Sequence, residues 1–238
     1  MMNGNALCPG LGDYLIAQAR NNHWSNNRLN SACLRLPASE YYENRPSFFG
    51  SIHIHLDHIV FVDWLYLERL TGEQYLPVDV GEELHSELAL LVEDQVTADR
   101  TLTEYCKAAT PETLASKVSF KLLDGTQYTE AVWSVLAHLF THQIHHRGQV
   151  HDMLSATSVA PPQLDQFFLS SDLPLREGEL KALKLPIEYR GLMEYSSIGR
   201  FLAFGTVTNL TTFLSRNDSK QPTSTGSEFR FMLICRCL

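Results

Sequence analysis

The chain has 238 residues, of which 44% are hydrophobic and 19% are charged, and its net charge is −8. This composition is that of an ordered globular protein, and the acidic charge argues against a general electrostatic affinity for nucleic acid or anionic lipid. No apolar run reaches the roughly 18–20 residues of a membrane span. No signal peptide is evident at the start, and five scattered cysteines indicate reduced thiols. We therefore expect a cytoplasmic protein with no nucleic-acid or membrane partner.

Hydrophobic periodicity predicts four long helices, approximately over residues 12–36, 47–70, 82–108 and 129–155. The third has apolar positions at alternating steps of three and four, which is typical of a helix-bundle seam. Between the third and fourth helices, alternation over residues 117–128 predicts a short β-hairpin. The fold class is thus all-α, a four-helix bundle with one hairpin. Connections of roughly 10–20 residues are compatible with either a crossover bundle or a simple up-and-down bundle.

Charge and composition change near Pro186. The first 186 residues carry 13 basic and 23 acidic side chains, whereas the last 52 carry 6 and 4 and are rich in Ser and Thr. We therefore predict an N-terminal arm at 1–10, the bundle domain at 11–186, and an extension at 187–238 whose order the sequence leaves open.

Five of the ten histidines fall within the fourth predicted helix. His138, His142 and His146 follow one another at i,i+4 spacing, which lets two imidazoles meet one metal ion. One ion cannot take all three, because His138 and His146 are separated by about 12 Å of helix rise. His142 and His146 share the apolar stripe of Val135, Leu139 and Met153. His138 and His145 lie farther round the helix from this stripe. The stripe therefore favours His142 and His146 as the ligand pair.

The second predicted helix offers a third ligand. His58 lies on its apolar stripe, His53 lies well off it, and His55 is near enough to remain a competitor. Three inward imidazoles would leave coordination positions to water or substrate, as in catalytic rather than structural metal sites. Asp63 could orient an imidazole or a metal-bound water, and Gln149, three residues after His146, could line the site.

Four blocks of sequence resemble a known family. They are NHWSNNRL at 22–29, FFGSIH at 48–53 with LDHI at 56–59 and Asp63, HLFTHQIHHRGQV at 138–150, and PPQLD at 161–165. Together they resemble the DinB/YfiT superfamily of metal-binding four-helix proteins, and most closely its DinB branch. The resemblance implies that His58, His142 and His146 bind a divalent metal, in agreement with the stripe. Asp57 and Thr141 stand where the family usually has Asn.

The resemblance also implies functions. Other superfamily members are metal-dependent thiol transferases and isomerases, so the expected partners are a low-molecular-weight thiol and a small electrophile. It further implies a homodimer through helix faces. A non-catalytic metal-binding protein of the stress response is the alternative, and a merely packed polar core is the third interpretation. Three imidazoles suit Zn, Ni, Cu and Fe alike. Metal affinity should fall below about pH 6, because bound imidazoles must be neutral.

Overall fold

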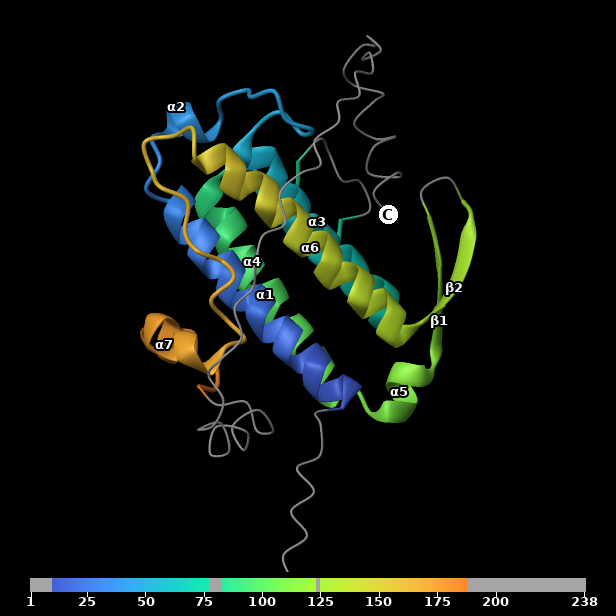
Figure 1. The fold of residues 1–238 in the computed structure, drawn as a ribbon. Coiled ribbons are helices and arrows are strands. Elements are labelled where there is room, and N and C mark those ends of the chain that lie inside the picture. Colours follow the sequence, from blue (N-terminus) through green and yellow to red (C-terminus); the bar gives the residue numbers. More distant parts are fainter. Residues whose placement is uncertain (1–9, 78–82, 123–124, 188–238) are drawn as a thin grey trace, which may run out of the picture.

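The computed structural model describes three stretches of the chain, residues 10–77, 83–122 and 125–187. Its four long helices form a bundle (Figure 1). They are α1 (Leu11–Cys33), α3 (Ile52–Thr71), α4 (Leu88–Ala108) and α6 (Val132–Leu154). Each coincides with one predicted helix, so the predicted all-α bundle is confirmed. Among the described helices, none combines the length and hydropathy needed to cross a bilayer.

Three helices begin later than predicted, and two of them, α3 and α4, follow loops. Helix α3 starts at Ile52 because the Ser51 hydroxyl caps it, accepting a hydrogen bond from the Ile54 amide at 3.2 Å. Gly50 just before it has a φ of 84°, which a side chain would disfavour. Helix α4 starts at Leu88 rather than near Glu82. Residues 47–51 and 83–87 are therefore loops, and those before α3 reach the candidate site.

The predicted hairpin is present and longer than expected. Strand β1 (Lys117–Lys121) pairs antiparallel with β2 (Gln127–Ala131), and Phe120 lies opposite Tyr128. A short helix, α5 (Pro111–Ala115), leads into it. Because β2 continues to Ala131, α6 starts at Val132 and not near Thr129. The hairpin consequently lies beside the end at which α6 begins (Figure 1).

The order of the helices around the bundle settles the question of topology. Helix α1 packs mainly against α4 and α6, and α3 packs against the same two helices. Helices α1 and α3 are therefore diagonal, and the connection between them crosses one end of the bundle. That connection contains the short helix α2 (Ala38–Tyr41). The bundle is of the crossover kind, and α3 and α6, which carry the candidate ligands, are neighbours.

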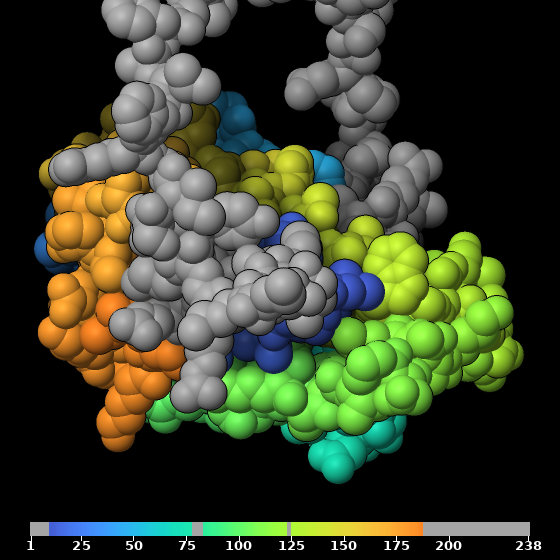
Figure 2. Space-filling view, turned by 60° about the horizontal axis from the view of Figure 1, so that its bottom comes forward, coloured from blue at the N-terminus to red at the C-terminus, as the bar shows by residue number. Residues whose placement is uncertain are grey.

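The segment after α6 folds back onto α1. It contains a 3-10 turn at Ser170–Asp172 and the helix α7 (Leu173–Ala182), which the sequence analysis did not predict. The Trp24 indole donates to Glu179 at 2.6 Å, and Arg28 forms an ion pair with the same carboxylate at 2.8 Å. This segment and the hairpin lie on opposite sides of the molecule (Figure 2, orange and yellow-green).

The predicted domain limits are only partly within the described residues. Nearly all of the N-terminal arm and of the extension at 187–238 lies outside them. Within them, Trp24 and Phe167 are buried together, with ring centroids 5.5 Å apart, in a small core separate from the main one. Residues of α1 in the first resembling block thus hold the C-terminal segment in place.

Candidate metal centre

Three buried imidazoles from two neighbouring helices meet in the bundle. His58 comes from α3, and His142 and His146 lie one turn apart on α6. One nitrogen of each ring lies within 4.8 Å of the others. The Nε2 atoms of His58 and His142 face each other at 3.3 Å. The three residues chosen by the helical stripe are therefore brought together, in a geometry that could hold a metal ion.

The donor atoms fit a divalent cation. Zinc–nitrogen bonds are about 2.0–2.1 Å long, so two nitrogens on a tetrahedral ion lie about 3.3 Å apart. This is the spacing of the His58 and His142 Nε2 atoms. The Nε2 atom of His146 is buried and has no hydrogen-bond partner. A buried polar atom without a partner costs free energy, and a metal ion would remove that cost.

Gln149 supports the third imidazole. Its Oε1 atom is 2.8 Å from Nδ1 of His146, so this carbonyl oxygen accepts a hydrogen bond from Nδ1–H. The tautomer that results has its lone pair on Nε2, the nitrogen left without a partner. The residue predicted from its i+3 spacing thus touches a member of the triad, and its importance for metal affinity stays a prediction.

Phe49 closes one side of the triad, and the sequence analysis did not single it out. Its ring centroid lies 4.4 Å from that of His58 and 5.6 Å from that of His146. Only 5% of the residue is exposed. An apolar ring in this position keeps water from one face of the imidazoles. The pair Phe48-Phe49 before Gly50 was the sequence feature that could have indicated this contact. The position of the Phe49 ring depends, however, on the path of the loop.

The competing histidines of α3 have other partners. Nδ1 of His55 lies 2.8 Å from the Ser51 carbonyl oxygen, to which it can donate. The ring centroids of His55 and His146 are 6.5 Å apart. His53 lies between the Tyr41 hydroxyl and the Glu83 carboxylate, at 3.1 and 3.0 Å. Neither ring belongs to the group of three whose nitrogens converge.

The other histidines of α6 also lie outside the triad. His138 is hydrogen bonded through Nδ1 to the Tyr66 hydroxyl. His145 is exposed, and its ring meets that of His146 edge-on with centroids 5.0 Å apart. This arrangement matches the expectation that both lie farther round the helix than His142.

The DinB family model matches residues 5–176 of the chain, which include all three histidines. The chain belongs to the DinB family. Its members are helical bundles that bind metal, in keeping with the fold and the triad found here. The search of curated proteins found no match to this chain.

Burial keeps the imidazoles of the DinB triad neutral. It lowers the pKa of His142 to about 3 and that of His146 to about 4, and it lowers the pKa of His58 well below its usual value. Neighbouring imidazoles add to the effect on all three rings. Metal binding requires the neutral form. Because of these shifts, protons should compete with the metal for the folded site only at a pH below the value of about 6 that the sequence predicts.

We expect the metal-free protein to lose stability in mild acid. In the unfolded chain these rings have a pKa of about 6.5, so below that pH the unfolded state binds protons that the native rings do not. The free energy of unfolding should fall as pH drops from about 6.5 toward 4, by about 2 kcal/mol at pH 5 for each of His142 and His146, and His58 adds to the fall in the same direction. Urea denaturation across this range measures it. A constant free energy of unfolding between about pH 7.5 and pH 5 would contradict the expectation.

The hydrogen bonds of Asp63 go to two glutamine side chains and not to an imidazole of the triad, and its action on a metal-bound water stays a prediction. Its carboxylate accepts hydrogen bonds from Gln143 at 2.7 Å and Gln95 at 2.8 Å. Gln143 also donates to the Ile59 carbonyl of α3 at 2.9 Å. Asp63 is fully buried, and burial raises the pKa of its carboxyl group. Asp63 of α3 is thus hydrogen bonded to Gln95 of α4 and to Gln143 of α6. Gln143 is the residue next to His142 in the sequence, so Asp63 lies beside the site without bonding to an imidazole.

A second buried carboxylate continues this network. Asp99 of α4 accepts hydrogen bonds from Asn22 at 3.0 Å and Asn26 at 2.9 Å. Both asparagines accept from Arg147 of α6 through their side-chain oxygens. Burial raises the pKa of Asp99 well above its usual value and lowers that of Arg147 to about 10. The asparagines of the first resembling block thus link the buried guanidinium of Arg147 to the buried carboxyl group of Asp99.

Proposed function

We propose that this DinB protein is a metal-dependent thiol S-transferase whose divalent ion, Zn²⁺, Ni²⁺ or a similar cation, is held by His58, His142 and His146. One observation carries the proposal most directly. Three buried, neutral imidazoles converge, and the three nitrogens leave coordination positions for a further ligand. A site of this kind suits chemistry at the metal, whereas structural zinc sites are usually closed by four protein ligands.

The chemistry of the proposed reaction follows from the donor set. A divalent ion held by His58, His142 and His146 would lower the pKa of a thiol bound beside it, so that the thiol would release its proton to solvent and react as the thiolate near neutral pH. The thiolate sulfur forms a bond to the electrophilic carbon of the acceptor. The bond from that carbon to its leaving group breaks, and the leaving group departs with the electron pair. Phe49 limits water at the imidazoles, and Gln149 fixes the ring of His146.

A polar pocket next to Gln149 gives a hydrophilic thiol a place to bind. Its volume is about 580 Å³, and it lies between the end of α6 and the connection leading to α3. Its polar lining includes Glu43, Asn44, Ser47, Gln149 and Asp152. Because Gln149 also bonds His146, a molecule in this pocket would touch the triad's immediate support. This lining suits the amide, hydroxyl and amino groups of a low-molecular-weight thiol.

A non-catalytic, metal-binding role in the stress response is the second candidate. The burial of all three imidazoles and the contact of the Phe49 ring with His58, at an interplanar angle of 37°, favour it, because both restrict access to the ion. In that case the metal would stabilise the fold or report on metal supply. The homodimer and the cytoplasmic location stay predictions from the sequence.

Thiol consumption by tag-free protein separates the two candidates. The protein would be loaded with Zn²⁺, Ni²⁺ or Mn²⁺ and given 1-chloro-2,4-dinitrobenzene with glutathione, mycothiol or bacillithiol in turn. We expect chloride-releasing conjugation with at least one thiol, abolished by chelation and by His142→Ala but not by His145→Ala. Stoichiometric metal binding without conjugation by any of these thiols would support the non-catalytic role. Failure to bind metal would overturn both.

A further inference from the structure

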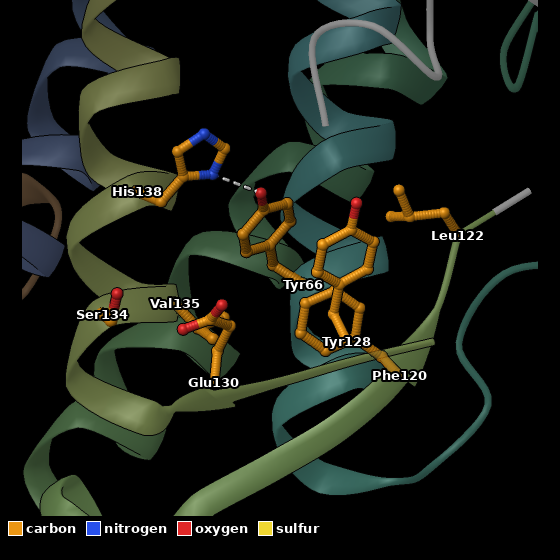
Figure 3. Close-up of a pocket in the computed structure, with 8 residues that line it drawn as sticks. All are labelled: Tyr66, Phe120, Leu122, Tyr128, Glu130, Ser134, Val135 and His138. Atoms are coloured by element: carbon orange, nitrogen blue, oxygen red, sulfur yellow. Dashed lines mark hydrogen bonds between the residues drawn. The ribbon is translucent and has the colours of Figure 1, made fainter. Parts of the chain in front are cut away.

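A second pocket lies on the other side of the triad, where the hairpin meets the bundle. The residues that line it are drawn in Figure 3. Its volume is about 410 Å³. The rings of Tyr66, Phe120 and Tyr128 form one wall, and Ser134 and His138 of α6 contribute to the wall across from them. The pocket therefore has an aromatic wall facing a side with hydrogen-bonding groups.

Charged groups of both signs border this pocket, so its electrostatics select neither anions nor cations. Glu130 is among the lining residues and would repel an anion. A cation meets a different obstacle, because the guanidinium of Arg69 already lies 4.5 Å from the ring centre of Phe120 and 4.9 Å from that of Tyr66. That positive charge opposes a second cation at the same rings. An uncharged molecule avoids both penalties.

The shape and composition of the lining favour a flat ligand. Phe120 and Tyr128 are cross-strand partners whose rings lie nearly parallel, at an interplanar angle of 19°. Leu122 and Val135 add apolar surface. Aromatic rings contribute most when another planar group packs against them. The ligand class that fits is thus an uncharged, planar aromatic molecule.

His138 connects the pocket to the candidate metal centre. It lines the pocket and bonds the Tyr66 hydroxyl, and its ring centroid is 6.5 Å from that of His142. Along α6 the polar pocket at Gln149 lies after the triad, whereas this one lies before it. Two pockets of different chemistry therefore flank the three imidazoles.

We propose that the aromatic pocket binds an uncharged, planar aromatic molecule and that this is the site of the electrophilic acceptor. The binding itself is independent of the reaction, and only the acceptor role rests on the proposed function. Two substrates of unlike polarity would then approach the triad from opposite directions along α6.

Calorimetric titration of the full-length protein with 1,3-dinitrobenzene tests the binding. This probe is planar and uncharged and has no leaving group, so no thiol is needed. We expect saturable binding to both the metal-free and the zinc-loaded protein. Tyr128→Ala should raise Kd about tenfold by removing one exposed ring of the wall. Tyr14→Ala is the matched control, because Tyr14 is similarly exposed on α1, and it should leave Kd unchanged.

A second variant keeps the test independent of the hairpin. Ser134→Phe adds a ring to the α6 side of the pocket and should abolish saturation, with the fold checked by the thermal melt. Benzylamine and benzoate should bind at least about tenfold more weakly than the neutral probe.

Three outcomes would overturn the proposal. They are the absence of saturable binding, binding unaffected by both Tyr128→Ala and Ser134→Phe, and equal affinity for a charged probe. Binding as expected in a protein that consumes no thiol would instead contradict the proposed function and leave the pocket assignment standing.

Discussion

Replacing His142 with alanine is expected to remove metal binding, raising Kd for Zn²⁺ by more than about 100-fold. Loss of a residue that merely supports a ligand costs 10–100-fold, and loss of a ligand costs more. His142 lies one helical turn from His146, and its Nε2 atom is 3.3 Å from that of His58. Its ring centroid lies 4.3 Å from that of His146 and 5.1 Å from that of His58, so it contacts both other members of the triad. Competition with a chelating dye, alongside the metal content of the purified protein, measures the effect.

Two histidines of the same helix supply matched controls. His138→Ala and His145→Ala remove an imidazole from α6 without touching the three converging nitrogens. Both variants should retain one metal ion per chain with little change in affinity. The opposite pattern, in which His138→Ala loses the metal while His146→Ala keeps it, would show that the ligand pair is assigned one turn too late.

Replacing Arg147 with methionine should destabilise the protein by about 3–5 kcal/mol, because it leaves buried carboxylates without their cation. Arg147 is 3% exposed and donates to Asn22 and Asn26, which donate in turn to Asp99. Methionine keeps much of the volume of the side chain, so the loss would come mainly from charge and hydrogen bonding. The free energy of unfolding from urea denaturation is the quantity to measure.

Arg100→Met is the control for this prediction. Arg100 is exposed on α4, where removal of a charge should change stability by less than about 1 kcal/mol. If Arg147→Met cost no more than Arg100→Met, the buried network would be unimportant for the stability of the bundle. The hydrogen bonds by which this network joins α1, α4 and α6 would then not be needed to hold His142 and His146 in position.

The triad could be predicted because it depends on a single local rule. The helical period places His142 and His146 on the apolar stripe of α6, and it places His58 on that of α3. Two amphipathic helices that pack together must turn these stripes toward each other. The same rule leaves His138 and His145 to one side, as the structure shows.

The surroundings of the triad could not be predicted in this way. Phe49 reaches His58 through a loop whose path is fixed by Gly50 and the Ser51 cap, and a helix had been expected there. The partners of Asp63 and Arg147 come from α4 and α1, so they depend on which helices are neighbours. The sequence left that topology open between two kinds of bundle.

Asp57, which stands where the family usually has Asn, also has a structural role that only the three-dimensional structure shows. The Asp57 carboxylate accepts hydrogen bonds from the backbone amides of Leu84 and His85, at 2.7 and 2.9 Å. It also contacts the His85 ring at 2.9 Å. Asp57 therefore anchors the loop that precedes α4, and it affects how the chain reaches that helix rather than the ligand set.

X-ray absorption at the zinc edge of the zinc-loaded, tag-free protein tests the central claim most directly. The account predicts three imidazole nitrogens at about 2.0–2.1 Å and at least one further ligand from solvent or substrate. The imidazole signal should fall to two rings, or the metal should be lost, in His58→Ala. A first shell of sulfur ligands, or a spectrum unchanged by His58→Ala, would contradict the assignment of the ion to His58, His142 and His146.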